Sequence, residues 1–200
     1  MNTGMASAGE DIGGVRMRML DREEMTPAQR DLDSEFDSSS LNKGKGPIRL
    51  MLRSPEAAKH ILGLGAALRK QSVIPPRLVE LLVLVHARLW GDQYEWMLHC
   101  DRGADHGLSP STIAALRNGK TPEDLSGEEQ VVVAFTIELE TRHKLTNATY
   151  TAALECFGEM GVAELVFWIG QYCTISLILA AAPEQGVVQD LPKCSNPFAE

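Results

Sequence analysis

Residues 75–90 read PPRLVELLVLVHARLW, and this stretch decides the fold of the chain. Proline is tolerated in the first turn of a helix, so Pro75-Pro76 ends one segment and begins the next. Gly91 then ends the new segment. The residues between are apolar nearly all round rather than along one face, and a helix of that kind is buried. The stretch therefore predicts a central helix that other helices must cover.

Signals for helix starts recur on both sides of this segment. A hydroxyl or carboxylate side chain stands before a proline, or three residues before a glutamate, as in the caps of helix N-termini. These starts are Thr26-Pro27, Ser54-Pro55, Asp92 with Glu95, Ser109-Pro110, Ser126 with Glu129, and Thr146. We expect the second of these helices to run to about Lys70. The third should end at His106, with Gly107 in the left-handed conformation that closes it.

No Asn-Gly or Asp-Gly turn is flanked by alternating strand patterns, so the chain is predicted to be all-α. We expect a single compact helical domain of about seven helices over residues 25–191. Residues 38–47 are polar and lack periodicity, which predicts a loop. Residues 1–24 should form a flexible N-terminal tail, and residues 192–200 a C-terminal tail.

The composition is typical of a soluble globular chain, with 44% apolar and 23% charged residues in a length of 200. The 19 basic and 27 acidic side chains give a formal charge of −8, which argues against a nucleic acid or an anionic membrane as the main partner. Aromatic and histidine residues are few, so single-stranded nucleic acid is not expected either.

The cysteines and the first residues bear on the cellular compartment. Cys100, Cys156, Cys173 and Cys194 lie too far apart for zinc ligands or a dithiol redox pair. The opening residues, MNTGMASAGEDIGG, have neither a basic nor an apolar leader segment and contain acids that a transit peptide would avoid. We therefore expect reduced thiols and a cytoplasmic location.

A membrane span has to be weighed at one place, between Val162 and Ala182. Residues 165–182 carry no charge over 18 positions, which approaches the length that crosses a bilayer. No Lys or Arg stands close to either end, and several polar or small residues interrupt the run. These are Gly170, Gln171, Tyr172, Thr174 and Ser176. The pattern favours a buried core or subunit-interface helix, and no membrane is expected.

Glu80 is the one acidic residue in the predicted central helix. Its helical neighbours Val83, Leu84 and Ala87 are apolar, so burial would raise the pKa of the carboxyl and make it a proton donor or acceptor near neutral pH. A structural ion pair with Arg77 or Arg88 on the same helix is an equally good interpretation of this residue alone.

On the next helix, a polar stripe borders an apolar face. At 100° per residue the stripe contains Asp92, Glu95, His99, Arg102 and His106, beside Trp96, Met97, Cys100 and Ala104. Glu95 and His99 are four residues apart, so the carboxylate can orient the imidazole. The alternatives are that Asp92 and Glu95 only cap the helix and that His99 is an ordinary edge histidine.

Other kinds of site have weaker support. Glu80, Glu95, His99 and His106 are acceptable ligands for zinc or iron, but no H-E-x-x-H or paired Glu-x-x-His motif is present, and we expect no metal. No Gly-x-Ser-x-Gly elbow supports a serine hydrolase. Gly63-Leu64-Gly65 lacks the third glycine and the preceding strand of a dinucleotide loop.

At these residues the sequence resembles the carboxymuconolactone decarboxylase family, which includes the alkylhydroperoxidase D-like proteins. The resemblance covers roughly residues 26–191. Its motifs are Pro75-Pro76-Arg77-Leu78 with Glu80, Arg88-Leu89-Trp90-Gly91, Tyr94-Glu95-Trp96 with His99, Gly107-Leu108-Ser109, residues 126–135, Thr149-Tyr150, Phe157-Gly158 and Gly161-Val162-Ala163-Glu164-Leu165. It implies an alkylhydroperoxidase D-like helical fold that forms homo-oligomers, trimers or hexamers.

The peroxidase branch of this family places a Cys-x-x-Cys pair between a glutamate and a histidine. Here Glu80 and His99 fit the outer positions, whereas the cysteine positions carry Asp92 and Glu95. Without a thiolate at these positions there is no nucleophile for a peroxide, so thiol peroxidase activity is not expected. Cys100 does not replace the pair, because it lies on the apolar face of its helix.

The remaining resemblance is to the decarboxylase branch, which removes CO2 from a carboxylated, unsaturated lactone in aromatic-compound catabolism. It implies a lyase that needs no metal or organic cofactor. In this assignment His99 is the hydrogen-bond donor or proton shuttle, Glu80 is an acid kept protonated by apolar surroundings, and Glu95 orients His99. Asp92 and Trp96 would line the substrate pocket, and Arg69 or Arg77 would neutralise substrate carboxylates.

Two further interpretations stay open. The chain could be an isomerase or dehydratase that acts on another small cyclic substrate in a biosynthetic pathway. It could also be an oligomeric family member that has kept the fold and lost the chemistry.

Overall fold

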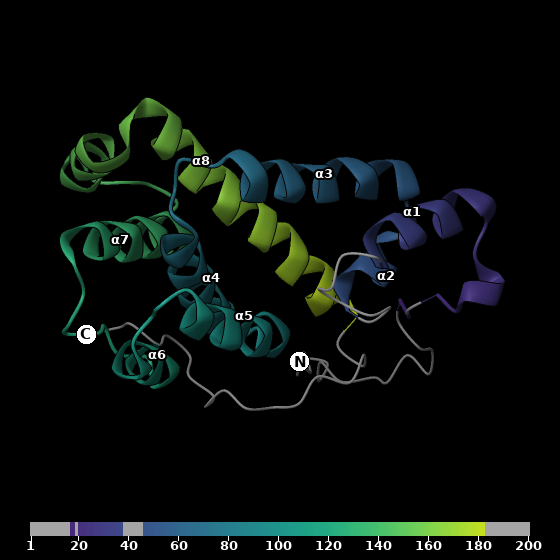
Figure 1. Cartoon of the computed structure of the whole chain (residues 1–200), viewed down its shortest axis with the longest axis horizontal. Helices are drawn as coiled ribbons and strands as arrows, with labels where there is room; N and C mark the ends of the chain where they lie inside the picture. Colours follow the sequence, from purple (N-terminus) through teal and green to yellow (C-terminus); the bar gives the residue numbers. More distant parts are fainter. Residues whose placement is uncertain (1–16, 19, 38–45, 183–200) are drawn as a thin grey trace, which may run out of the picture.

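The computed structural model describes residues 17–18, 20–37 and 46–182, and over these residues it contains only helices and their connections. The elements in chain order are η1 (Arg22–Glu24), a 3-10 helix, and the α helices α1 (Pro27–Asp37), α2 (Pro47–Met51), α3 (Pro55–Gln71), α4 (Pro76–Trp90), α5 (Gln93–Asp105), α6 (Pro110–Arg117), α7 (Gly127–Arg142) and α8 (Asn147–Ala181). The prediction of one compact all-α domain is confirmed (Figure 1).

Helix α4 lies in the middle of the bundle, as its all-round apolar sequence predicts. Every residue from Leu78 to Arg88 is buried. The helix packs against α5, α6, α7 and α8 (Figure 1). It ends at Gly91, whose φ of 65° is the left-handed conformation that glycine adopts without strain. Because different neighbours cover its two sides, α4 contributes to two hydrophobic clusters, one through Leu82 and Val83 and the other through Leu81 and Leu84.

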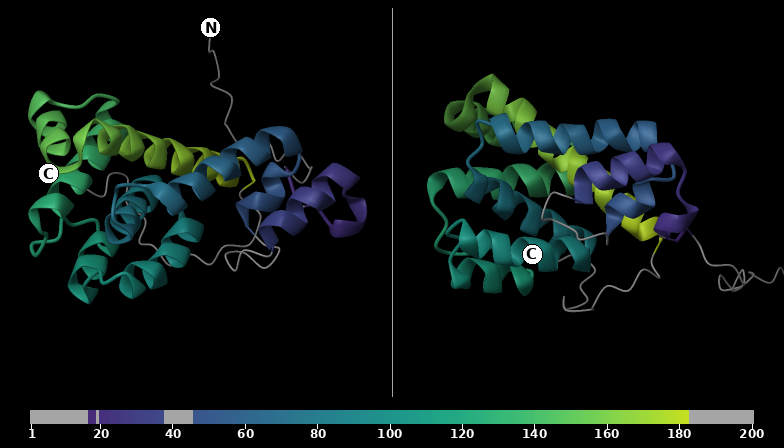
Figure 2. Two further views of the ribbon diagram at one scale, coloured as in Figure 1. Left: turned by 45° about the horizontal axis from the view of Figure 1, so that its top comes forward. Right: turned by 45° about the vertical axis from the view of Figure 1, so that its right-hand side comes forward.

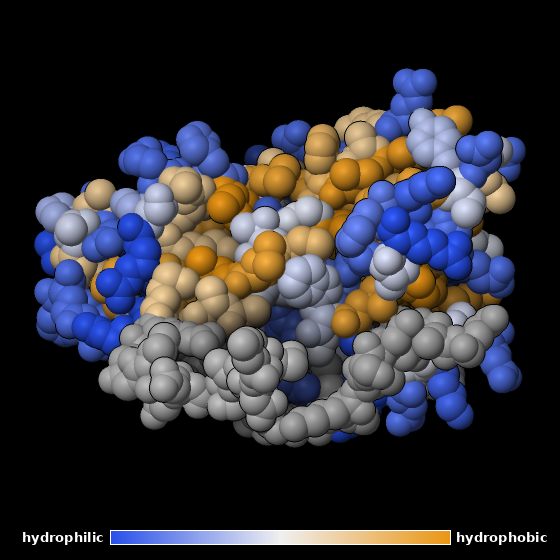
Figure 3. Space-filling model, turned by 180° about the vertical axis from the view of Figure 1, so that it is seen from behind, coloured by the Kyte–Doolittle hydropathy of each residue, from blue (hydrophilic) through white to orange (hydrophobic). Residues whose placement is uncertain are grey.

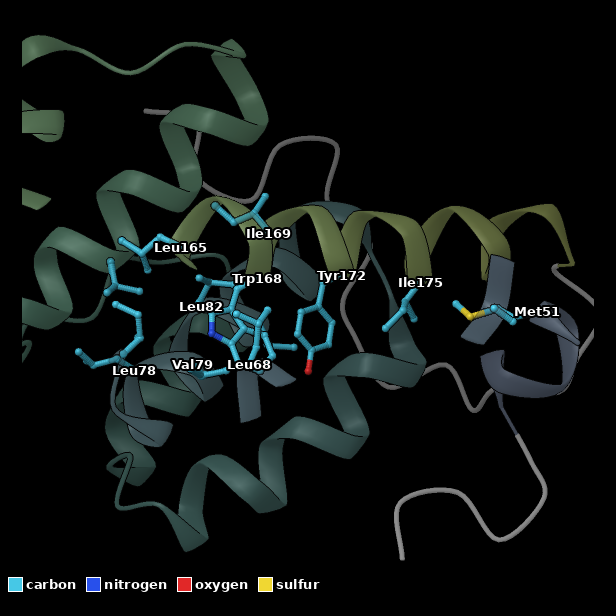
Figure 4. Close-up of a cluster of buried hydrophobic side chains, with 14 of the residues drawn as sticks. Met51, Leu68, Leu78, Val79, Leu82, Leu165, Trp168, Ile169, Tyr172 and Ile175 are labelled. Carbon is cyan, nitrogen blue, oxygen red and sulfur yellow. The ribbon is translucent and has the colours of Figure 1, made fainter. Parts of the chain in front are cut away.

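Helix α8 crosses the molecule. It bends at Gly158, whose φ of 66° interrupts the helical conformation, and residues 159–181 then run as one long helix. In Figure 1 and the right-hand view of Figure 2, α3 lies on one side of this segment and α5 with α6 on the other. Figure 4 shows Trp168, Tyr172 and Ile175 pointing from α8 into the core, and Leu165 and Ile169 belong to the same buried cluster.

Among the described residues, α8 is also the one helix whose length and hydropathy would allow it to cross a membrane. Half of its most apolar window is buried inside the molecule. Polar side chains on its buried face bond to the segments between other helices: Glu164 accepts from the Ser72 hydroxyl and the Val73 N–H, and Ser176 donates to Asp92. These contacts agree with the interpretation of a core helix.

The structure differs from the sequence predictions at the N-terminal end of the domain and at α2. Leu20 is buried and residues 22–24 form η1, so the fold begins before residue 25. Helix α2 was not predicted, because its five residues follow Gly46 without a side-chain cap. Residues 1–16 of the expected N-terminal tail, the C-terminal tail and most of the loop at 38–47 lie outside the described residues.

Candidate active site

The candidate active site is centred on His99, between α4 and α5. His99 is 1% exposed and Glu80 is 7% exposed. The Nδ1 atom of His99 lies 2.5 Å from Oε2 of Glu80. On the other side of the ring, Nε2 lies 3.2 Å from Oε2 of Glu95 and 3.3 Å from the hydroxyl oxygen of Tyr172. The structure thus brings together the three catalytic residues predicted from the sequence and adds a fourth group, a phenol from α8.

Local sequence explains how α5 presents two of these groups. The Asp92 carboxylate accepts a hydrogen bond of 3.0 Å from the Glu95 N–H, which caps the helix and fixes where it starts. Glu95 and His99 are one turn apart and face the same side. The Glu95 carboxylate does not complete a capping box by accepting from the Asp92 N–H, because it lies against His99 instead. Asp92 therefore has the capping role that one interpretation of the sequence gave it, and Glu95 contacts the imidazole, as the other interpretation requires.

The surroundings of His99 favour the imidazolium form. Burial lowers the pKa of His99, but hydrogen bonds to Glu80 and Glu95 and the charges of these carboxylates raise it, and the net direction is upward. An imidazolium donates from both ring nitrogens, which matches two carboxylates on opposite sides of the ring. The direction of this shift favours a proton on the imidazole of His99, whereas the sequence interpretation placed a proton on Glu80.

Tyr172 adds a neutral donor to the cluster. Burial raises the pKa of its hydroxyl, so the phenol stays protonated. The hydroxyl accepts a hydrogen bond of 3.3 Å from Nη1 of Arg69. Figure 4 shows its ring pointing away from the α8 axis with the oxygen at the far end. The edge of the His99 ring meets the Tyr172 ring at a centroid distance of 5.2 Å, which holds the two side chains against one another.

Two cavities flank this cluster. One, of about 270 Å³, is lined by Glu95, His99 and Tyr172, together with apolar side chains of α2, α3 and α8. The other, of about 320 Å³, is lined by Glu80 and His106. Arg69 and Arg102 border both cavities. Each cavity is at the small end of the range of ligand sites in proteins, which suits a compact organic molecule.

The first cavity contains polar atoms that lack a partner. Nη2 of Arg102 and Oε1 of Gln171 are buried, and neither has a hydrogen-bond partner within the described part of the chain. Buried polar atoms are almost always satisfied, so unpaired ones that face a cavity indicate where a ligand would bond. A guanidinium suits a carboxylate, and an amide suits a hydroxyl or carbonyl group.

Three residues predicted for the substrate pocket are not on either cavity. Arg77 lies on the first turn of α4 and pairs with Glu129 of α7, with its Nη2 atom 2.6 Å from Oε1. Trp96 is 100° from Glu95 around α5 and packs into the cluster that contains Leu81 and Leu84. Asp92 bonds to the Ser176 hydroxyl besides capping α5. Of the two predicted arginines, Arg69 is at the site and Arg77 is not.

The sequence interpretation did not assign Tyr172, Gln171 or Arg102 to the site. The first two appear in the sequence only as polar interruptions of the apolar run at 165–182. Arg102 belongs to the predicted polar stripe on α5, but the sequence predicted no function for it. The cysteine pair of a thiol peroxidase is absent, as expected from the residues themselves: Asp92 and Glu95 stand there, and burial raises the pKa of the Cys173 thiol to about 11.

The fold and the site together define a class: an all-helical protein with a buried carboxylate, imidazole and phenol cluster between two small cavities. No family model matches the sequence, and no curated protein matches it either. We therefore infer the function from the geometry of the site and from the residues that carry the resemblance.

Proposed function

We propose that this chain is a cofactor-free carboxy-lyase that decarboxylates a small carboxylated lactone or a related cyclic acid. The observation that carries the proposal is the position of His99. Its Nε2 atom lies beside Glu95 and Tyr172, and all three residues line the same cavity as Arg69 and Arg102. The cavity therefore combines a proton donor, a neutral hydroxyl donor and two guanidinium groups.

In the proposed reaction the substrate carboxylate leaves as CO2 and a proton takes its place on carbon. The electrons of the broken bond pass through a conjugated double bond to the lactone carbonyl and form a dienolate. Hydrogen bonds to the developing oxyanion lower the barrier to this step, and the Tyr172 hydroxyl and the imidazolium of His99 are the donors on this cavity. His99 then gives its proton to carbon and takes another from water.

The carboxylates act through His99. Glu80 holds Nδ1 at 2.5 Å and keeps the ring charged, and Glu95 holds Nε2 at the cavity wall. Arg69 and Arg102 would bind a second carboxylate or a carbonyl of the substrate. The unpaired Nη2 atom of Arg102 is the group best placed for this contact.

A proton-transfer isomerase is the second candidate. The observation that favours it is the carboxylate of Glu95, which lies beside the imidazole on the same cavity. A base and an acid at one cavity can remove a proton from one carbon and return it to another without loss of CO2. Product analysis distinguishes the two candidates, because only the lyase releases CO2.

The test is to incubate the purified protein with enzymatically prepared carboxymuconolactone and to follow CO2 release. We expect turnover that falls by at least a hundredfold in His99→Asn, whereas the exposed histidine variant His60→Asn on α3 keeps it. Arg102→Gln should raise KM more than it lowers kcat, because it removes a binding contact. Turnover with product formed and no CO2 would favour the isomerase. If His99→Asn kept full turnover, neither candidate would stand.

A further inference from the structure

A second polar cluster lies in the core where α4, α7 and α8 meet, next to Tyr172. The rings of His86 and Tyr172 have a centroid distance of 6.1 Å. His86 is completely buried, and the Glu140 side chain is nearly so. Nδ1 of His86 lies 2.8 Å from Oε1 of Glu140, and Nε2 lies 2.9 Å from the Ser176 hydroxyl oxygen. The proposed lyase does not use this cluster.

The directions of the hydrogen bonds around His86 leave one contact without a proton. The Ser176 hydroxyl donates to Oδ2 of Asp92 at 2.5 Å, so its oxygen is an acceptor toward His86. If the imidazole is neutral, its one proton lies on Nε2 and Nδ1 is a lone pair. That lone pair faces a carboxylate oxygen of Glu140. Two electron pairs at this distance require a cation between them, either a second proton or a metal ion.

A third side chain with an atom that can bind a metal favours the metal ion over the proton. The Sγ atom of Cys173, on α8, lies within 4.8 Å of a ring nitrogen of His86 and of a carboxylate oxygen of Glu140. Imidazole nitrogen, thiolate sulfur and carboxylate oxygen are the three ligand types that zinc accepts. Neighbouring ligands around tetrahedral zinc are roughly 3–4 Å apart, so the histidine and glutamate need to separate by only part of an ångström. A fourth position is left for water.

The groups behind these ligands have the arrangement typical of metal sites. The far nitrogen of His86 bonds to Ser176, which in turn bonds to Asp92. The far oxygen of Glu140 accepts a hydrogen bond of 2.9 Å from the indole N–H of Trp90. Such outer contacts fix the tautomer and the orientation of metal ligands. Trp90 and Cys173 are not fully buried, so an ion can reach the cluster from the surface.

We propose that His86, Glu140 and Cys173 bind one divalent transition-metal ion of the zinc type. The bonds would run to Nδ1, Oε1 and Sγ. The ion would link α4, α7 and α8 through residues that are far apart in the sequence. The spacing of the residues could not indicate this site, because no two of its ligands share a helix. The site is separate from the residues Glu80, Glu95, His99 and His106 that were considered for a metal from the sequence.

The test uses cobalt(II) as the probe with the full chain after treatment with a chelator. We expect one cobalt ion per chain, with a thiolate-to-cobalt charge-transfer band and visible bands of a tetrahedral site, both lost on addition of zinc. Zinc should also raise the melting temperature, because an ion that binds only the folded state stabilises it. Cys173→Ser should abolish the charge-transfer band, and Glu140→Gln should weaken binding at least tenfold. Cys156→Ser, at an exposed cysteine, is the matched control.

Two results would overturn the proposal. One is the absence of stoichiometric cobalt or zinc binding at micromolar concentrations, which would leave a proton as the cation between His86 and Glu140. The other is a charge-transfer band that persists in Cys173→Ser, since the metal would then be bound elsewhere. If the variant fails to fold, the X-ray absorption spectrum of the zinc-loaded parent decides instead. It must show one sulfur ligand together with nitrogen and oxygen.

Discussion

His99 determines how the stability of this molecule responds to pH. Its pKa is raised above the ordinary value of 6.5: burial lowers it, but the bonds to Glu80 and Glu95 raise it by more. A group whose pKa is higher in the folded than in the unfolded state makes its full contribution to stability when the pH is below its pKa in the unfolded state. That contribution is lost as the pH rises through the folded value. We therefore expect the free energy of unfolding to decrease as the pH rises above 6.5, in urea titrations at a series of pH values.

Glu80→Gln tests the source of this effect. The amide keeps the shape of the side chain but removes the charge that raises the pKa of His99, so we expect the histidine to titrate at a lower pH in NMR spectra. The free energy of unfolding near pH 6 should fall by about 1–3 kcal/mol, because a buried hydrogen bond to a charged group is weakened. Glu155→Gln, at an exposed glutamate of α8, should change neither quantity. An unchanged titration of His99 in Glu80→Gln would contradict the contact between the two side chains.

Tyr172→Phe separates binding of the oxyanion from proton transfer. The substitution removes only the hydroxyl that contacts His99 and Arg69. If the proposed lyase is correct, kcat should fall by about 10²–10³, the cost of losing one oxyanion donor. The free energy of unfolding should fall by only about 1 kcal/mol. Steady-state CO2 release and urea unfolding measure the two effects. A variant with unchanged kcat would remove Tyr172 from the proposed mechanism.

At the scale of the residue, the sequence could predict the parts of the site that are close in the chain. Glu95 and His99 are one turn apart, and Glu80 stands out in an apolar helix, so both patterns are local. Tyr172 is 73 positions from His99, and only the packing of α5 and α8 on α4 brings them together. The ion pair of Arg77 could not be predicted for the same reason: its charge is visible in the sequence, but its partner Glu129 on α7 is not.

At the scale of the element, the N-terminal ends of helices were predictable, because the residues that cap a helix lie within four positions of its start. Ser109, Ser126 and Thr146 each accept a hydrogen bond from the N–H three residues later, as their sequences indicate. The bend of α8 was not predicted, although the Phe157-Gly158 pair is one of the motifs of the family resemblance. A glycine in a helix does not by itself indicate a break, and only the backbone of the structure shows the positive φ of Gly158.

The bend of α8 depends on a second glycine. A Cβ atom added at Gly161 would lie 2.3 Å from Cβ of Phe157. Because Cβ of Phe157 is fixed to its backbone, the helix would have to shift, and we expect Gly161→Ala to lower the free energy of unfolding by about 1–3 kcal/mol. Gly63→Ala in α3 meets no atom within 4 Å and should raise it by up to about 1 kcal/mol through helix propensity. Thermal and urea unfolding of both variants would measure the two changes in the free energy of unfolding. Changes of the same sign would contradict the prediction.

At the scale of the whole molecule, α8 leaves an apolar stripe uncovered. Met160, Phe167 and Leu177 are 58%, 49% and 58% exposed. With the small residues between them they recur at alternating spacings of three and four. The full set is Met160, Ala163, Phe167, Gly170, Thr174, Leu177 and Ala181. This is the spacing of a seam between two helices. Hydrophobic side chains also reach the surface on the back of the molecule (Figure 3).

The stripe supports the expected homo-oligomer, since apolar patches on soluble chains mark contacts with other molecules. We expect the protein to be a trimer or hexamer in light scattering after gel filtration. Phe167→Glu would place a charge in the middle of the seam, and burying it unpaired should weaken association at least a hundredfold. Val73→Glu, at an exposed apolar residue off the stripe, should leave the oligomer intact. A parent that is monomeric at micromolar concentration would contradict the oligomer, and co-sedimentation of the parent with lipid vesicles would assign the stripe to a bilayer instead.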